Sequence, residues 1–202
     1  PELSAGLGFD LGGGTTANLN LSGGTQIFRS REQEARIAGN PLPAFDERFR
    51  TWNNEWFYEL SGDIEFAFGP GQLKLIALEA FEHGNFRTQS LLELGTLADS
   101  GSRFTRVNDA GERIARGEYR VALGGVDWQL SAEAAFNRLD QVGSLFSYDD
   151  PVGSYLPVPF PQGVGGVREK RFESILSAGF PLASGLTVQL TGGAEHSTIS
   201  QT

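Results

Sequence analysis

The segment WFYELSGDIEFAF, residues 56–68, decides the fold because its side chains alternate between two kinds. Every second residue from Trp56 to Phe68 is apolar or glycine, whereas the residues between them include Glu59, Asp63 and Glu65. Successive side chains of a β-strand point to opposite faces, so a strand separates these two sets, while a helix would mix them. The segment is therefore predicted to be a long strand with one apolar and one polar face.

The same alternation recurs along the chain and predicts about eight strands. The expected strands lie near residues 2–10, 15–30, 47–68, 72–94, 103–123, 127–147, 165–180 and 186–200. The segment LKLIALEA, residues 73–80, is apolar at both parities, so the pattern leaves its inward and outward residues unassigned.

The connections between these strands alternate between short and long. The short ones are rich in glycine and lie near residues 12–14, 69–71, 124–126 and 182–185, while the long ones span 31–46, 95–102 and 148–164. In an up-and-down antiparallel sheet every second connection lies at the same end, so one end should carry turns and the other loops. Prolines at 151, 157, 159 and 161 are expected to prevent regular strand pairing in the third long loop.

Composition narrows the class of protein. The chain has 202 residues, no Cys, no Met and a formal net charge of −9. A disulfide framework and a thiolate metal site are therefore excluded, and the acidic excess argues against a nucleic-acid surface. No run approaches the ~20 apolar residues of a membrane helix. Without Met, and with Pro1 first, the chain is expected to have lost its original start by processing or truncation.

Three features favour a membrane β-barrel over a soluble β-sandwich or barrel, which remains the alternative. The predicted strands are far longer than the ~5–6 residues usual in globular proteins. Aromatic residues mark the ends of the apolar stripes, as Trp56 and Phe68 do, and the other face is rich in acids. The predicted fold is an all-β, antiparallel up-and-down transmembrane β-barrel, with residues 1–202 forming a single barrel region.

Two stretches resemble the barrel of TonB-dependent outer-membrane receptors of Gram-negative bacteria. They are EWFYELSGDIEFAFGPGQLKLIALEAFEHGNF, residues 55–86, and GEYRVALGGVDWQLSAEAAFN, residues 117–137. The resemblance implies an outer-membrane location and energy-coupled uptake of a nutrient such as an iron chelate, cobalamin or a glycan. The implied partners are outer-membrane lipid, a small-molecule ligand and the TonB complex, which is contacted through a plug domain absent from this chain.

The chain also departs from that family, whose barrel has 22 strands and an N-terminal plug. There is room here for about eight strands, and neither a plug-like segment nor a TonB box is visible, so a fragment of a larger barrel is expected. The alternative is a complete eight-stranded outer-membrane barrel with a structural, adhesion or porin-like role. Long strands and the lack of a terminal aromatic residue weigh against it.

The sequence predicts neither an enzyme nor a cofactor or metal site. His83 and His196 are the two histidines, and neither has the ligand spacing of a zinc site. No GxSxG motif is present, although an outer-membrane hydrolase built on His83 remains an alternative. The glycine-rich stretch GLGFDLGGG, residues 6–14, lacks the lysine of a phosphate loop.

Ligand contacts are expected on the polar face and in the outer loops. The candidates are Arg36, Glu59, Asp63, Arg120, Glu133, Tyr148, Tyr155 and Phe160. The acids of the polar face, among them Glu173 and Glu195, are interpreted as a hydrated lumen wall. Arg120, Arg138 and Arg171 are expected to offset part of that charge in the lumen or loops.

Overall fold

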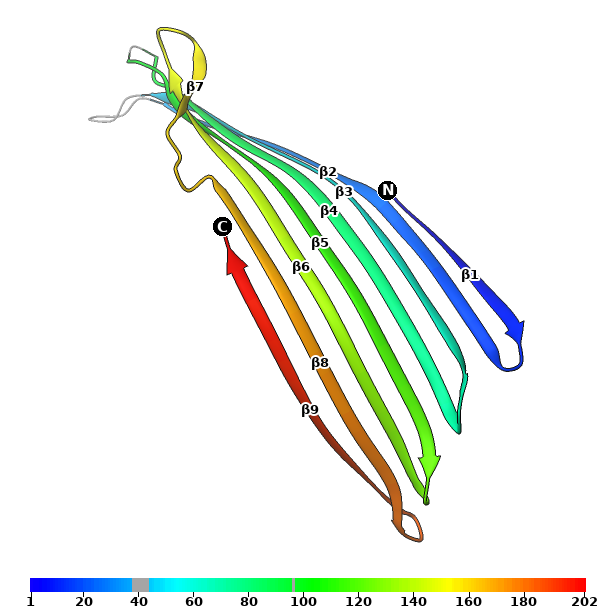
Figure 1. Cartoon of the computed structure of the whole chain (residues 1–202). Helices are drawn as coiled ribbons and strands as arrows, with labels where there is room; N and C mark the ends of the chain where they lie inside the picture. The colour runs from blue at the N-terminus through cyan, green and yellow to red at the C-terminus, as the bar shows by residue number, and fades with distance from the viewer. Residues whose placement is uncertain (38–43, 96) are drawn as a thin grey trace.

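A computed structural model describes residues 1–37, 44–95 and 97–202, and these residues form one antiparallel sheet (Figure 1). Its strands are β1 (Glu2–Gly12), β2 (Thr15–Arg36), β3 (Phe45–Phe68), β4 (Gly71–Glu93), β5 (Ser100–Leu123), β6 (Val126–Asp149), β7 (Ser154–Val158), β8 (Val164–Ala183) and β9 (Leu186–Gln201). Main strands pair in chain order, and β7 is a short side branch on β6. In the described ranges we find no helix long and apolar enough to span a membrane.

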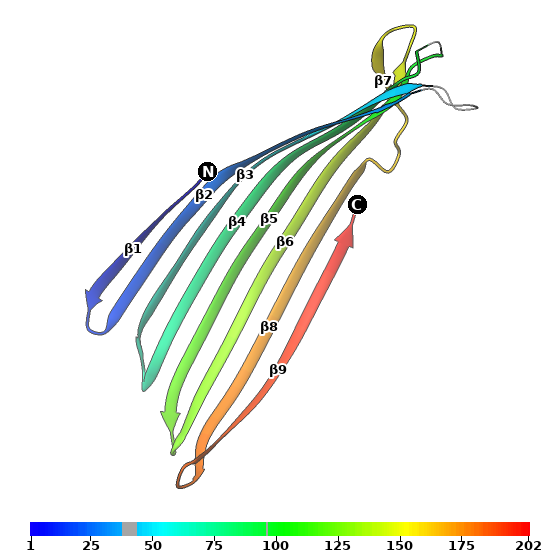
Figure 2. The ribbon, with the colours of Figure 1, turned by 180° about the vertical axis from the view of Figure 1, so that it is seen from behind.

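The alternation of short and long connections predicted from the sequence is confirmed. The hairpins β1–β2, β3–β4, β5–β6 and β8–β9 all turn at one end of the sheet, whereas the strand ends that the longer connections join lie at the other (Figures 1 and 2). Glycines with positive φ make these turns possible, as Gly69 and Gly124 do with φ of 58° and 63°. We call these two ends the turn end and the loop end.

The sheet is open along both edges. β1 pairs only with β2 and β9 only with β8, and the described residues contain no ladder between β1 and β9. A closed eight-stranded barrel would need that ladder, so the structure does not adopt the small closed barrel considered as the alternative.

Two details differ from the sequence prediction. The proline-rich loop contains β7, in which Pro157 lies opposite Phe146 of β6. β7 is an edge strand, where a residue without a backbone N–H is tolerated, so proline did not prevent pairing there. β2 also continues to Arg36, which shortens the first expected loop. The proline pair of that loop, Pro41 and Pro43, lies outside the described residues.

The two faces of the sheet differ in shape as well as in polarity. Buried side chains occur on the face that carries Asp63, where Ala135 is 1% and Glu118 9% exposed. On the opposite face Phe136 and Phe172 remain 51% and 54% exposed. Side chains on the inside of a curved sheet crowd together, so the Asp63 face is concave and the other is convex.

The register also resolves the segment at 73–80, which is apolar at both parities. Leu73, Leu75 and Ala77 share the convex face with Ile64, whereas Ile76 and Leu78 lie on the concave face. The concave wall is therefore mainly, but not uniformly, polar.

Candidate functional site

An apolar band covers the turn-end half of the convex face. It crosses all the main strands and includes Leu7, Leu21, Leu60, Ile64, Leu75, Leu130, Leu176 and Leu190. On β6 it runs from Trp128 to Phe136, and on β8 from Phe172 to Phe180. These lengths match the ~9–11 residues that a tilted strand needs to cross a bilayer core.

Aromatic clusters bound this band on both sides. Towards the loop end, the ring of Phe81 lies 5.2 Å from that of Trp56 and 5.9 Å from that of Tyr58. Towards the turn end, Phe68 lies 6.1 Å from Tyr119, whose hydroxyl donates a hydrogen bond to the Phe68 carbonyl at 3.1 Å. An apolar band between two aromatic belts is the surface pattern of membrane β-barrels.

The concave face carries a ladder of ion pairs at the same height. Glu133 of β6 accepts a hydrogen bond from Arg171 of β8 at 3.0 Å and lies 3.8 Å from Arg116 of β5. Glu118 lies between Arg116 and Arg120, at 2.8 and 3.1 Å. These contacts pair Glu118 and Glu133 with three arginines across three neighbouring strands.

A second, smaller polar group lies nearer the first strands. Asp63 of β3 accepts hydrogen bonds from Asn18 of β2 at 3.2 and 3.3 Å and lies 3.3 Å from the ammonium group of Lys74 on β4.

The last strands carry a row of acids on the same face. Glu133 of β6 lies directly opposite Glu173 of β8, which in turn lies opposite Glu195 of β9. In the described part of the chain, no group of His, Cys, Asp or Glu side chains is arranged to hold a metal ion.

Beyond the apolar band, the convex face becomes basic towards the loop end. Its basic residues are Arg29, Arg31, Arg48, Arg50, Arg87, Arg103, Arg113, Arg138, Arg168 and Lys170, and its acidic residues are Asp46, Glu79, Glu93, Asp109 and Asp140. Cations therefore outnumber anions on this surface, although the chain as a whole carries a net charge of −9. We call this surface the basic belt.

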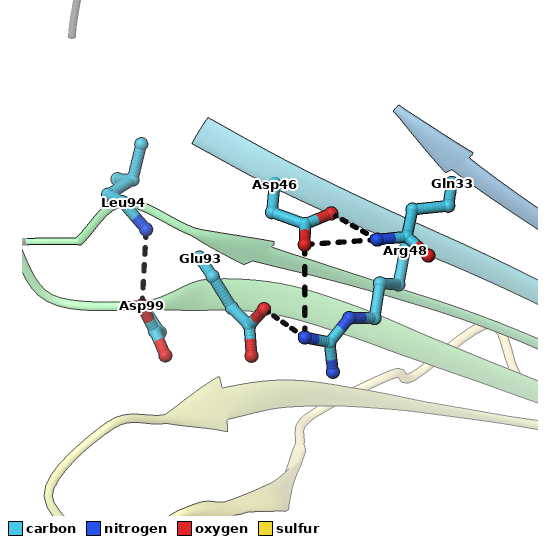
Figure 3. Close-up of polar contacts among 6 residues, drawn as sticks. All are labelled: Gln33, Asp46, Arg48, Glu93, Leu94 and Asp99. Carbon is cyan, nitrogen blue, oxygen red and sulfur yellow. Dashed lines mark hydrogen bonds and ion pairs between the residues drawn. The ribbon is translucent and has the colours of Figure 1, made fainter. Parts of the chain in front are cut away.

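Ion pairs tie the tips of the belt together at the loop end (Figure 3). Arg48 of β3 donates a hydrogen bond to Glu93 of β4 and lies 3.9 Å from Asp46, which accepts two hydrogen bonds from Gln33 of β2 at 3.1 Å. After β4, the Asp99 carboxylate accepts a hydrogen bond from the Leu94 amide at 3.2 Å. These contacts hold β2, β3 and β4 together beyond the band.

Tyr155 joins the short strand β7 to the sheet. Its hydroxyl donates a hydrogen bond to the Ser90 carbonyl at 2.8 Å, and the guanidinium of Arg103 lies 4.3 Å from its ring centroid. Burial raises the pKa of Tyr155, while burial and the neighbouring Arg87 lower the pKa of Arg103. Tyr148 packs edge-on against Tyr155, with ring centroids 5.1 Å apart.

The segment after β7 crosses the concave face. Phe160 packs edge-on against Phe104, with ring centroids 6.1 Å apart, and a Cβ added to Gly143 would lie 3.2 Å from the Phe160 ring. The Gly143 amide donates a hydrogen bond to the Gly163 carbonyl at 2.5 Å. The loop is thus anchored over the concave face by an aromatic side chain and a backbone contact.

The eight predicted contact residues do not converge on one pocket. Glu59, Asp63, Arg120 and Glu133 lie on the concave face, whereas Tyr148 and Tyr155 lie at the loop end of the convex face. Phe160 anchors the loop, and Arg36 stacks on the Phe45 ring at 4.5 Å from its centroid. Ligand contact by any of these residues stays a prediction.

Arg138 is a correction to the sequence interpretation. It was expected to offset acids in the lumen or loops, but its parity places it on the convex face, 5.5 Å from the Phe81 ring centroid. The sequence analysis does not identify Arg113, Arg168 and Lys170 as members of one surface. These residues occupy the same alternate positions of their strands as the apolar residues, so extending that alternation towards the loop end would have identified them.

His83 does find an acidic partner, since its Nδ1 lies 2.7 Å from the Asp109 carboxylate and its ring stacks on Trp56. A Ser-His-Asp site also needs a hydroxyl group hydrogen-bonded to the other ring nitrogen. Within the described ranges His83 forms no hydrogen bond with a hydroxyl group. The pair alone therefore lacks the nucleophile of a hydrolase.

Sequence comparison with known proteins does not assign the chain to a family, because no family model and no curated protein matches it. Among solved structures, the chain is similar to the ferric preacinetobactin receptor BauA of Acinetobacter baumannii, with 14% identity and a TM-score of 0.38 over 100% of this chain and 41% of that one. For the ferric citrate transporter FecA, the values are 11% and 0.36 over 97% and 34%. For the siderophore receptor PiuA of Acinetobacter baumannii, they are 8% and 0.26 over 98% and 44%.

The chain thus spans less than half the length of each of these three proteins. Similarity at these values does not assign a family.

Proposed function

We propose that this chain forms part of the wall of an outer-membrane β-barrel, with its convex face towards lipid and its concave face towards a water-filled lumen. The observation that most strongly supports this orientation is the exposed apolar band between two aromatic belts. In water such a band would be covered by a second layer, as in a β-sandwich, but the described residues form a single sheet. Lipid is the solvent that an uncovered apolar band fits.

The concave ladder supports the same orientation. A lumen wall must satisfy its charges beside water, and Glu133 and Glu118 do so by pairing with arginines of the same or neighbouring strands. The strands β3, β5 and β6 each have 24 residues, more than a bilayer core requires. The excess extends past the band at the loop end, which we assign to the cell exterior.

We further propose that the whole protein is a TonB-dependent receptor that takes up a nutrient such as an iron chelate, cobalamin or a glycan. The support is the sequence resemblance of residues 55–86 and 117–137, together with the long strand extensions and outer loops. Ligand binding is assigned to the loop end, and the contact with the TonB complex to a plug domain outside these residues.

Uptake measurements on the full-length gene product test this function. Cells limited for iron, cobalamin or a glycan should lose uptake of one such nutrient when the gene is deleted. Loss of TonB should have the same effect, and the double mutant should be no worse than either single one. Uptake that depends on the gene but is indifferent to TonB would instead assign a passive channel.

A further inference from the structure

A groove of about 500 Å³ lies on the convex face where the apolar band meets the basic belt. Two rows of residues cross it from β4 to β8. One row places Phe81, Gly111, Arg138 and Arg168 opposite one another, and the next places Glu79, Arg113, Phe136 and Lys170. The groove therefore has an aromatic side towards the band and four cations from three neighbouring strands.

The cations in this groove are only half compensated. Arg168 donates two hydrogen bonds to Asp140, at 2.7 and 2.9 Å, and Arg113 donates one to Glu79 at 3.1 Å. Lys170 forms no hydrogen bond or ion pair with any described residue. Arg138 likewise has no hydrogen bond or ion pair among the described residues, and its guanidinium lies over the Phe81 ring. Two positive charges thus remain without an anion.

The register makes this imbalance costly. Arg138 lies directly opposite Arg168, and like charges at directly opposed positions of an antiparallel pair are destabilising. The same arrangement recurs along the basic belt, where Arg31 lies directly opposite Arg50. An anion bound between the two guanidinium groups would turn this repulsion into two charge-assisted hydrogen bonds.

Gly111 shapes the floor of the groove. A Cβ at this position would lie 3.0 Å from Nε and 3.3 Å from Cγ of Arg138. The missing side chain lets Arg138 lie flat across β5, towards the Phe81 ring, instead of projecting away from the sheet. The guanidinium is therefore held at the boundary between the apolar and basic surfaces.

We propose that this groove binds the phosphate group of a membrane lipid, with Arg138 and Lys170 as the principal ligands and Arg168 and Arg113 as flanking cations. The acyl chains would then lie along the apolar band, past Phe136, and the phosphate at the level where lipid headgroups begin. This inference rests on the proposed membrane orientation, and it adds the chemical class of the lipid and the residues that hold it.

Native mass spectrometry of the full-length protein in a nonionic detergent tests the site. Phosphatidic acid is the probe, diacylglycerol with the same acyl chains is the uncharged control, and inorganic phosphate is the competitor. Phosphatidic acid should form a retained complex and diacylglycerol should not. Complete displacement of the lipid by an equal concentration of inorganic phosphate would overturn the proposal, because the groove would then be a site for free anions.

The variant R138Q/K170Q should reduce phosphatidic acid binding at least about tenfold, since two charge-assisted contacts are removed. The variant K74Q/R120Q removes the same charge from the concave face and should bind the lipid as the parent does. Equal loss in both variants would overturn the site by making the effect one of net charge. Membrane flotation of cells expressing the parent separates the two proposals: absence from the membrane contradicts the barrel, whereas flotation with unchanged lipid binding in R138Q/K170Q contradicts only the lipid site.

Discussion

The guanidinium of Arg103 lies 4.3 Å from the centroid of the Tyr155 ring, and this contact joins the short strand β7 to β5. Burial raises the pKa of Tyr155 above its usual value near 10, while Arg103 opposes that rise. The neutral phenol is thus the form that the folded loop end favours.

The first prediction concerns pH. A folded-state pKa above the unfolded value stabilises the β7 contact below about pH 10, and this stabilisation is lost as the pH rises through the folded-state pKa. We expect the β7 hairpin to become sensitive to protease above that range and Tyr155→Phe to abolish the transition. The ultraviolet absorbance of tyrosinate and limited proteolysis measure it. A protease sensitivity that stays constant up to pH 12 would contradict the assignment.

The second prediction tests which face meets lipid. Leu176→Arg places a charge in the middle of the apolar band on β8 and should destabilise the inserted protein by about 2–4 kcal/mol. Ser177→Arg, one residue along the strand, places the same charge on the concave face and should cost far less, although it breaks the hydrogen bond with Thr191. Heat-modified gel mobility and denaturant unfolding in micelles measure both. Equal effects at the two positions would be incompatible with the proposed orientation.

The third prediction concerns the concave ladder. Glu133→Ala removes the carboxylate that Arg171 and Arg116 share, and should lower the free energy of unfolding by about 1–3 kcal/mol. Glu173→Ala is the matched control, because Glu173 lies opposite Glu133 and its removal relieves repulsion. Tryptophan fluorescence during denaturant unfolding compares them. If Glu173→Ala proved the more destabilising change, the Glu133 carboxylate would not be the group that holds the ladder together.

Much of this fold follows from the sequence, because period-2 alternation carries the strand positions directly. The turn at 69–71 is found as expected, and the strand expected near 47–68 is found as β3, Phe45–Phe68. β7 was missed because its prolines suggested that pairing was impossible, while an edge strand tolerates them. The basic belt was missed because Arg138 was interpreted as a lumen or loop residue and Lys170 was not considered, although both share the parity of Phe136 and Phe172. Which charges meet across strands depends on register, and register appears only in the folded sheet.

The fourth prediction concerns the turn end. A Cβ at Gly71 would clash with the Arg120 carbonyl oxygen and lie 2.9 Å from the Tyr119 ring. Gly71→Ala should therefore force β4 and β5 apart at the turn end and destabilise the sheet by about 1–3 kcal/mol. Gly192→Ala is the control, since a Cβ there meets nothing within 4 Å. Unfolding midpoints of the two variants measure this difference. Equal midpoints would show that the β4–β5 pairing adjusts to the added methyl group without loss of stability.

The fifth prediction concerns the loop anchor. Phe160→Ala removes the ring that packs on Phe104 and over Gly143, so the segment between β6 and β8 should become more sensitive to protease. Val152→Ala at the exposed tip of the hairpin should leave the cleavage rate unchanged. Cleavage sites are identified by mass spectrometry. An unaltered cleavage rate in Phe160→Ala would mean that backbone contacts alone hold the segment.

The strand order has a consequence for how the chain acquires its structure. Every ladder between main strands except β6–β8 joins consecutive strands of the chain, so most of the sheet can grow one strand at a time, with small loop-closure entropy at each step. The β6–β8 ladder is the exception, because the β7 hairpin and the Phe160 segment separate its two strands. Addition of the β8–β9 hairpin to the growing edge at β6 is therefore expected to be the slowest step of assembly.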